Sequence, residues 1–194
     1  MLRRICVFCG SMSGTREAYR AAARETGRLL AERGVTLVYG GGRIGLMGIL
    51  ADAALARGGD VVGVIPEHLV RKEVAHNGLA DLRTVSSMHE RKALMADLSD
   101  AFIALPGGYG TLDEFCEILS WSQLGLHQKP CGILNVDGYY DGLLGLFDHA
   151  VREGFLQAEH RALVVVDEHP GRLLQRLEEA PLPAVEKWID RQTR

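Results

Sequence analysis

The chain has 194 residues, of which 47 % are hydrophobic and 24 % are charged, and its formal net charge is −3. This length suits one well-filled core, and the composition is typical of a globular domain. The slight negative balance argues against an obligate nucleic-acid binder, because such proteins usually carry a basic face.

Two features of the sequence concern location. No apolar run approaches the length of a membrane span. The opening Met1-Leu2-Arg3-Arg4 is followed by only a short apolar run before Gly10, which is too little for a signal-peptide core. We therefore expect a cytoplasmic protein with no membrane partner.

Short apolar runs alternate with segments of helical spacing along the whole chain, with a polar and partly helical stretch at 67–80. The predicted strands are 5–8, 36–39, 61–65, 82–85, 101–105, 132–136 and 162–166. The predicted helices are 16–33, 46–57, 88–99, 111–124, 139–153 and 170–179. This alternation predicts a single α/β domain over 1–180, with a charged tail at 181–194. Its doubly wound, Rossmann-like parallel sheet would carry helices on both faces.

Glycine-rich or hydroxyl-rich loops follow four of the predicted strands, at 10–15, 40–45, 86–87 and 106–110. Because these are strand-to-helix loops of a parallel sheet, they fall on the edge where such folds bind ligands. We expect Ser11, Gly41 and Gly42 to take part in binding there.

The loop 106–110 carries three glycines between a strand and a helix that we expect to begin at Thr111. Glycines allow a ligand close to the backbone, and a helix N-terminus offers unpaired N–H groups to an anion. The loop therefore predicts a phosphate site. Thr111 and Glu114 also fit a capping box, so Glu114 could simply close the helix start.

The stretch 40–45 matches the dinucleotide pattern G-x-G-x-x-G. The acidic partner expected about twenty residues on is missing, because Asp60 precedes its strand and Glu67 lies beyond Pro66. We favour a second phosphate-facing loop, or one that allows close backbone approach.

Arg91 and Lys92 lie in the first turn of a predicted helix that Ser87 and Glu90 would cap. The helix dipole disfavours cations there, so the two are either solvated or matched by an anionic ligand or a carboxylate such as Glu114.

Other residue types give weaker signals. Tyr139, Tyr140 and Trp121 could line an adenine site, but aromatic residues at helical spacing favour a core or interface role. Cys6 and Cys9 form C-x-x-C inside a predicted strand, whereas a redox pair normally lies at a helix N-terminus. Since the sequence has no second such pair and no H-x-x-x-H, we expect no metal.

The segment Pro106-Gly107-Gly108-Tyr109-Gly110-Thr111-Leu112-Asp113-Glu114 resembles the P-G-G-x-G-T-x-x-E signature of the LONELY GUY (LOG) family. These are cytokinin-activating phosphoribohydrolases, formerly labelled lysine decarboxylases. Residues 88–92, 40–48 and 135–140 resemble further family segments, and the likeness spans roughly residues 6–166. Asp113 departs from the pattern, since many members have a second glutamate there.

The resemblance implies hydrolysis of the N-glycosidic bond of AMP or an N6-modified AMP, without a cofactor, by a homodimer. It implies that Arg91 and Glu114 are the catalytic pair, and a carboxylate is suited to stabilising an oxocarbenium-like state or activating water. The substrate contacts that it implies are Glu73, Lys92, Gly107, Gly108, Tyr109, Gly110, Thr111, Leu112, Asp113 and Ser120.

Two other functions compete with this one. A non-catalytic module could use the same loops to sense or sequester a nucleotide. An amino-acid decarboxylase would need a Schiff-base lysine near a pyridoxal phosphate. Lys92 is the only lysine well placed for that role, and its sequence neighbours do not resemble such a site.

Overall fold

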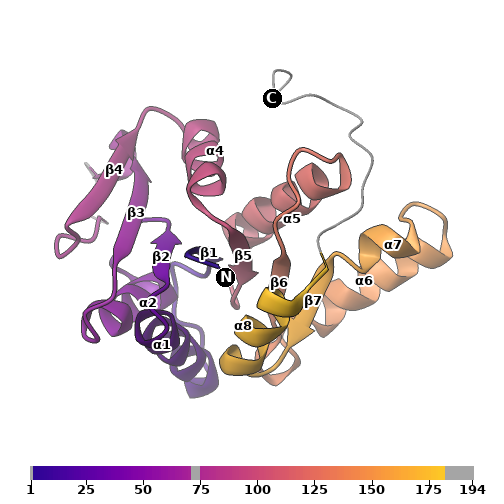
Figure 1. Ribbon diagram of the computed structural model, residues 1–194, viewed down its shortest axis with the longest axis horizontal. Coiled ribbons are helices and arrows are strands. Elements are labelled where there is room, and N and C mark those ends of the chain that lie inside the picture. Colours follow the sequence, from indigo (N-terminus) through magenta and orange to yellow (C-terminus); the bar gives the residue numbers. More distant parts are fainter. Residues whose placement is uncertain (1, 71–74, 182–194) are drawn as a thin grey trace.

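The structure is a computed structural model that describes residues 2–70 and 75–181. Its strands form one seven-stranded sheet of order β4-β3-β2-β1-β5-β6-β7, and every neighbouring pair is parallel (Figure 1). The strands are β1 (Arg4–Phe8), β2 (Thr36–Tyr39), β3 (Val61–Pro66), β4 (Asp81–Val85), β5 (Ala101–Ala104), β6 (Cys131–Leu134) and β7 (Val164–Asp167). The predicted parallel α/β fold is confirmed.

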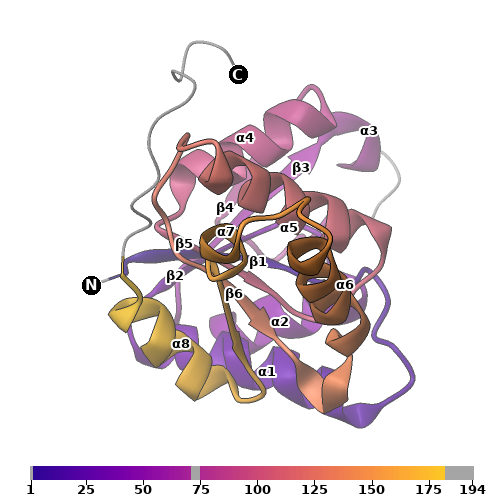
Figure 2. The same ribbon diagram turned by 90° about the vertical axis from the view of Figure 1, so that its right-hand side faces the viewer.

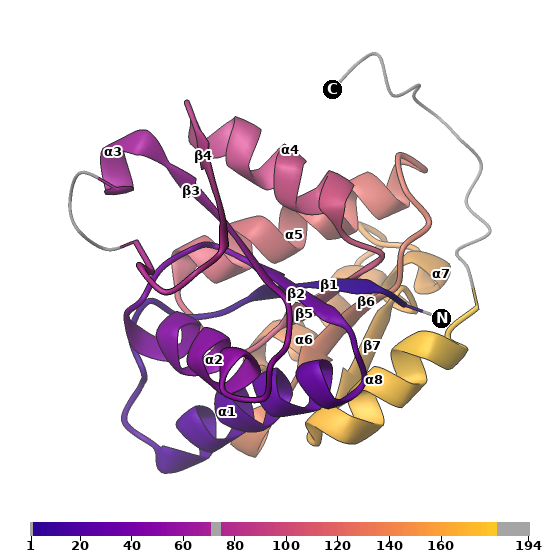
Figure 3. The ribbon, with the colours of Figure 1, turned by 60° about the vertical axis from the view of Figure 1, so that its left-hand side comes forward.

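Helices cover both faces of the sheet (Figures 2 and 3). Because alternate strand residues point to opposite sides, each face buries its own set of strand side chains. Ile5 and Val7 of β1 pack with α1, α2 and α8, whereas Cys6 and Phe8 pack with α4, α5 and α6. The helices are α1 (Glu17–Glu32), α2 (Gly45–Leu55), α3 (Glu67–Val70), α4 (Met88–Leu98), α5 (Tyr109–Gln123), α6 (Asp141–Arg152), α7 (Ala158–Arg161) and α8 (Pro170–Glu179), with the 3-10 turn η1 (Val136–Gly138). Neither face of the central strands is left to solvent.

Several predicted boundaries are wrong. The helix expected from residue 111 begins at Tyr109, and its N-cap is Gly108 rather than Thr111. The helix expected over 139–153 is α6, which covers only residues 141–152. It is preceded by η1, where Asp137 and Gly138 have positive φ angles and so separate the end of β6 from the helix. The short helix α7 was not predicted. The tail at 182–194 lies outside the described residues.

The capping box predicted for Ser87 and Glu90 has two hydrogen bonds, of which the structure contains one. The Ser87 hydroxyl accepts from the Glu90 amide at 3.1 Å. The return bond differs, since the Glu90 carboxylate accepts from the backbone N–H and hydroxyl of Ser86, both at 2.7 Å.

The sheet has a switch point beside β1, which lies between β2 and β5. The loop after β1 leads to α1 on one face, and the loop after β5 leads to α5 on the other (Figure 3). In open α/β sheets, ligands bind in the crevice where two such loops diverge. None of the helices within residues 2–70 and 75–181 has the length and apolar character that a membrane span requires.

Candidate active site

The loops after β1 and β5 touch each other at the switch point. The Gly10 amide donates to the Pro106 carbonyl at 3.0 Å. A Cβ atom on Gly107 would lie 2.1 Å from the Thr111 hydroxyl and 2.9 Å from the Gly10 amide nitrogen. Position 107 therefore accepts only glycine while the two loops keep this contact.

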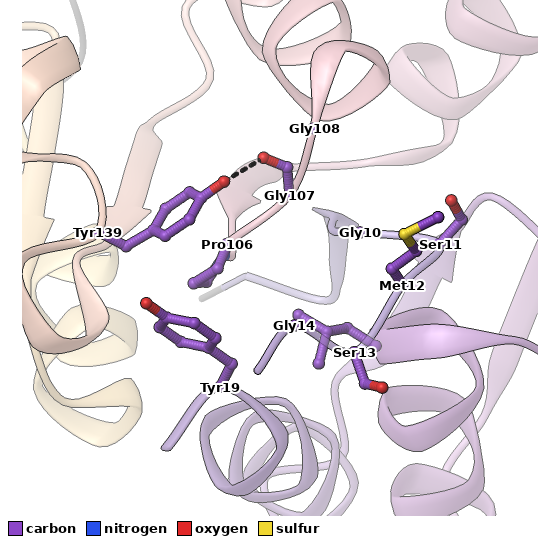
Figure 4. Close-up of a pocket in the computed structure, with 11 residues that line it drawn as sticks. Gly10, Ser11, Met12, Ser13, Gly14, Tyr19, Pro106, Gly107, Gly108 and Tyr139 are labelled. Carbon is purple, nitrogen blue, oxygen red and sulfur yellow. Dashed lines mark hydrogen bonds between the residues drawn. The ribbon is translucent and has the colours of Figure 1, made fainter. Parts of the chain in front are cut away.

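A pocket of about 260 Å³ opens between these loops (Figure 4). Its walls carry mainly apolar side chains from the loops, α1, α2 and the η1 end. The lining residues are Gly10, Ser11, Met12, Ser13, Gly14, Tyr19, Leu46, Pro106, Gly107, Gly108 and Tyr139. The predicted loops after β1 and β5 thus do meet, and Ser11 lines the same pocket as Gly107 and Gly108. We call residues 106–110 the phosphate loop, after the role that the sequence predicts for them.

The start of α5 supplies backbone donors next to this pocket. The amide of Leu112 makes a bond to the Gly108 carbonyl at 3.1 Å, so helix geometry leaves the amides before Leu112 without an intrahelical acceptor. A Cβ atom on Gly108 or Gly110 would meet nothing within 4 Å, so their backbone faces open space. The side chain of Tyr109 is also exposed. The loop therefore has room for an anion at the helix start.

A buried ion pair joins α4 to α5. Arg91 Nη1 lies 2.5 Å from Glu114 Oε1, and the two side chains are only 9 % and 8 % exposed. Arg91 Nε also donates to the Val64 carbonyl at 3.0 Å. Arg91 is therefore not solvated, and Glu114 meets the guanidinium instead of capping the helix. The sequence-based alternative that Glu114 only closes a capping box is wrong.

Burial dominates the titration of Glu114. Desolvation raises the pKa of its carboxyl above the ordinary value of 4.5, and the nearby Arg91 guanidinium opposes this rise. A carboxylate with a raised pKa and a fixed cationic partner is a common arrangement at catalytic sites.

The guanidinium of Arg91 crosses directly over Gly40, the residue that follows β2. A Cβ atom on Gly40 would lie 2.0 Å from Arg91 Nη2. The next two glycines serve the backbone: the Gly41 carbonyl accepts from the His76 amide at 2.9 Å, and Gly42 forms an isolated bridge with Ala75. The glycines at 40–42 thus allow other groups to come close to the backbone, as the sequence predicts. That Gly40 makes room for the guanidinium of Arg91 was not foreseen from the sequence.

Lys92 makes a second connection between α4 and α5. Its Nζ lies 3.1 Å from both Asp113 Oδ2 and Glu117 Oε2, and its side chain is 10 % exposed. Burial lowers the pKa of Lys92, but its hydrogen bonds to Asp113 and Glu117 outweigh burial and raise it. Lys92 is thus held as a cation.

The remaining predicted site residues lie farther apart. Gly41 and Gly42 are buried, and Leu112 packs against the core below α5. Ser120 donates to the Cys116 carbonyl at 2.8 Å and lines a different pocket between α5 and α7. Glu73 lies outside the described residues. The binding roles of these residues stay predictions.

Two tyrosines that follow β6 were assigned to a core or interface role but also contact the phosphate loop. The Tyr140 hydroxyl is buried and donates to the Leu105 carbonyl at 2.6 Å, while the exposed Tyr139 donates to Gly107 at the same distance. A pair of aromatic residues after a strand on the ligand edge is the signal that could have suggested this contact.

The parallel fold, the glycine loop before α5 and the buried Arg91–Glu114 pair define a doubly wound α/β protein with a candidate anion site and a candidate catalytic pair. Residues 47–177 match a family model described as "Possible lysine decarboxylase". The probable cytokinin riboside 5'-monophosphate phosphoribohydrolase LOGL9 of Oryza sativa subsp. japonica is 56 % identical over 91 % of this chain and 78 % of its own. The cytokinin riboside 5'-monophosphate phosphoribohydrolase LOG2 of Arabidopsis thaliana is 51 % identical over 91 % of this chain and 83 % of its own.

The chain belongs to this LOG family. The fold is shared more widely. A molybdenum cofactor binding protein from the phototrophic bacterium Rippkaea orientalis superposes with a TM-score of 0.69 at 22 % identity, over 92 % of this chain and 97 % of that one. At that identity the likeness concerns the fold alone.

Proposed function

We propose that this protein hydrolyses the N-glycosidic bond of a purine nucleoside 5′-monophosphate, releasing the free base and ribose 5-phosphate. The observation that carries the proposal is the buried Arg91–Glu114 pair, about one helical turn from the glycine loop at the start of α5. The family supports the same class of reaction. The proposed substrates are AMP and its N6-modified forms, the latter corresponding to the cytokinin riboside 5'-monophosphates in the relatives' names.

The geometry suits this reaction. A phosphate at the α5 amides would hold the ribose near Glu114. As the C1′–N9 bond breaks, the carboxylate stabilises the positive charge on the sugar or takes a proton from the attacking water. The water oxygen bonds to C1′, and the departing base receives the bonding electrons and a proton. Arg91 keeps the carboxylate in place.

The decarboxylase description of the family model fits the site poorly. A Schiff-base lysine needs a neutral amine, which burial or a nearby cation provides by lowering the pKa. Lys92, the lysine nearest the phosphate loop by sequence, is instead paired with two carboxylates that raise its pKa. We therefore propose no pyridoxal chemistry here.

Incubation with AMP, adenosine and lysine tests the proposed reaction. We expect adenine and ribose 5-phosphate from AMP, and far slower cleavage of adenosine because it lacks the group that the α5 amides would bind. Chromatography of the products and assay of released carbon dioxide measure both reactions. Equal cleavage of AMP and adenosine would contradict the phosphate site, while binding of AMP without cleavage would favour the sensor function.

We also propose that the protein is a homodimer. The apolar stripe of α5 does not offer the contact, because Phe115 and Ile118 are buried in this chain's own core. A better candidate is α6, none of whose side chains is buried, although it carries apolar residues. Leu146 is 59 % exposed and Phe155, just beyond the helix, is 87 % exposed.

Light scattering at micromolar concentration tests the dimer. We expect a mass about twice the 21.2 kDa of one chain, and a lower mass after Leu146→Glu with Phe155→Glu, because charges at an apolar contact are costly to bury. A wild-type mass of one chain would contradict the proposal. The cytoplasmic location stays a prediction from the sequence.

A further inference from the structure

Three successive carbonyl groups between β5 and the glycines of the phosphate loop, those of residues 105–107, each accept a hydrogen bond. The first binds the hydroxyl of Tyr140 and the third the hydroxyl of Tyr139, both at 2.6 Å. The second accepts from the amide of Gly10 at 3.0 Å. These three carbonyl groups are therefore held by groups from other parts of the chain, two of them by adjacent tyrosines.

Both tyrosines are themselves held in place. The Tyr140 amide donates to Asn135 Oδ1 at 2.7 Å, and Asn135 Nδ2 donates to Asp141 Oδ1 at 2.7 Å. The ring of Tyr139 makes edge contacts with Tyr19 and Tyr140, with ring centres 5.5 Å and 4.9 Å apart. The two hydroxyls thus project from a rigid support at the end of β6, and Figure 4 shows Tyr139 reaching Gly107 across the pocket.

The direction of a carbonyl fixes the direction of the next N–H, because the two point in opposite senses across a trans peptide. The described residues contain no cis peptide. With the Gly107 carbonyl turned toward Tyr139, the Gly108 N–H points the other way. If this peptide rotated, a carbonyl oxygen would replace the N–H on that side and repel an anion.

We propose that Tyr139 is a positioning residue for the substrate phosphate, acting through the carbonyl group of Gly107. The Tyr140 bond orients no donor, because the Leu105 carbonyl that it holds is followed by Pro106, which has no N–H. The proposal rests on the proposed function, because it assigns the phosphate of the nucleotide to the amide that the Tyr139 bond orients. Glycine makes the loop permissive, and Tyr139 selects one of the conformations that glycine allows. It contributes to phosphate affinity and takes no part in cleavage of the glycosidic bond.

Tyr139→Phe tests the proposal, since it removes the hydroxyl and keeps the ring. We expect the inhibition constants of inorganic phosphate and ribose 5-phosphate to rise about tenfold, as loss of one oriented hydrogen bond allows. The KM for AMP should rise in parallel, while kcat and the inhibition constant of adenine change little. A variant that had merely lost folded protein would show lower kcat and unaltered ligand affinities.

Tyr39→Phe is the matched control. Its hydroxyl is buried at the end of β2 and has no hydrogen-bond partner among the described residues, so its loss removes no bond. We expect unchanged phosphate affinity. Tyr140→Phe should leave phosphate affinity nearly unchanged, because the Leu105 carbonyl that Tyr140 holds is followed by Pro106, which has no N–H to orient.

Calorimetric titration with inorganic phosphate separates this inference from the proposed function. Wild-type phosphate affinity in Tyr139→Phe overturns the inference, whether or not the enzyme cleaves AMP. Failure of the wild-type protein to bind phosphate overturns it as well. Absence of AMP cleavage by a wild-type protein that binds phosphate, with weaker binding by Tyr139→Phe, contradicts only the proposed reaction.

Discussion

Replacing Glu114 with Gln should lower kcat for AMP cleavage about 10³-fold, equivalent to about 4 kcal/mol of transition-state stabilisation, while AMP still binds. Gln has nearly the same shape and keeps an oxygen for Arg91, which lies 2.5 Å from the carboxylate. What it loses is the negative charge that would stabilise the oxocarbenium-like state or activate water. Steady-state kinetics and thermal unfolding of the same preparation measure the effect.

A structural ion pair would behave differently. In that case Glu114→Gln would affect the unfolding temperature more than kcat, and near-normal kcat would leave a nucleotide pocket without a catalytic carboxylate. Glu117→Gln is the matched control, because it removes another ion-paired carboxylate from α5 while Lys92 keeps Asp113. Arg91→Ala should lose as much kcat as Glu114→Gln, and the double variant little more, since the pair acts as a unit.

The pH profile should report the same carboxyl. Burial raises the pKa of Glu114, so kcat/KM should fall on the acid side as pH drops through a value above 4.5. Arg91 lowers this pKa, so Arg91→Met should move the acid limb to higher pH. Linkage gives the effect of Glu114 on the free energy of unfolding. Because its pKa is higher in the folded protein than in the unfolded chain, the carboxyl stabilises the fold at pH values below the unfolded-state pKa, and this stabilisation is lost as pH rises through the folded-state pKa. Keeping Glu114 charged therefore costs some stability, as expected of a functional group.

Gly40→Ala should lower kcat about 10²-fold, the penalty that a misplacement of about 1 Å can produce. Its Cβ atom would lie 2.0 Å from Arg91 Nη2, so the guanidinium must leave its place over the backbone. Moving the guanidinium would break or lengthen its hydrogen bonds to the Glu114 carboxylate and the Val64 carbonyl. The fold should survive, because the atom in conflict is the end of a long side chain.

The control for this prediction is Gly171→Ala in α8, where the nearest atom to the new Cβ, on Leu29, is 3.7 Å away. We expect normal kinetics there. Neither glycine has a positive φ angle, so backbone strain does not separate the two variants. Normal kcat in Gly40→Ala would mean that Arg91 works equally well in another position.

Local patterns were sufficient for much of the molecule. Apolar runs of strand length and helical spacing identified every strand of the sheet, because the two faces of a parallel sheet must both be apolar. The glycines at 106–110 marked the loop that joins β5 to α5 at the switch point of the sheet. The two cations at 91 and 92 were recognised as costly in a first helical turn, and the structure identifies the carboxylates that compensate them.

The start of α5 shows where local patterns fail. A T-x-x-E sequence predicts a cap at Thr111, and nothing nearby distinguishes it from Gly108. The outcome depends on Arg91, which lies 23 residues before Glu114 and takes its carboxylate. Burying a guanidinium costs more than a cap contributes, so the pairing takes precedence over the local preference.

By itself, then, the sequence determined the α/β class, the ligand edge and the residue types available there, because these follow from periodicity and backbone chemistry. Only the tertiary structure decided which groups meet. Tyr139 reaches Gly107 across 32 residues, Tyr140 reaches Leu105 across 35, and Arg91 reaches Val64 across 27. Such contacts form where parallel strands bring their carboxyl ends to one edge, and burial there makes each polar group find a partner.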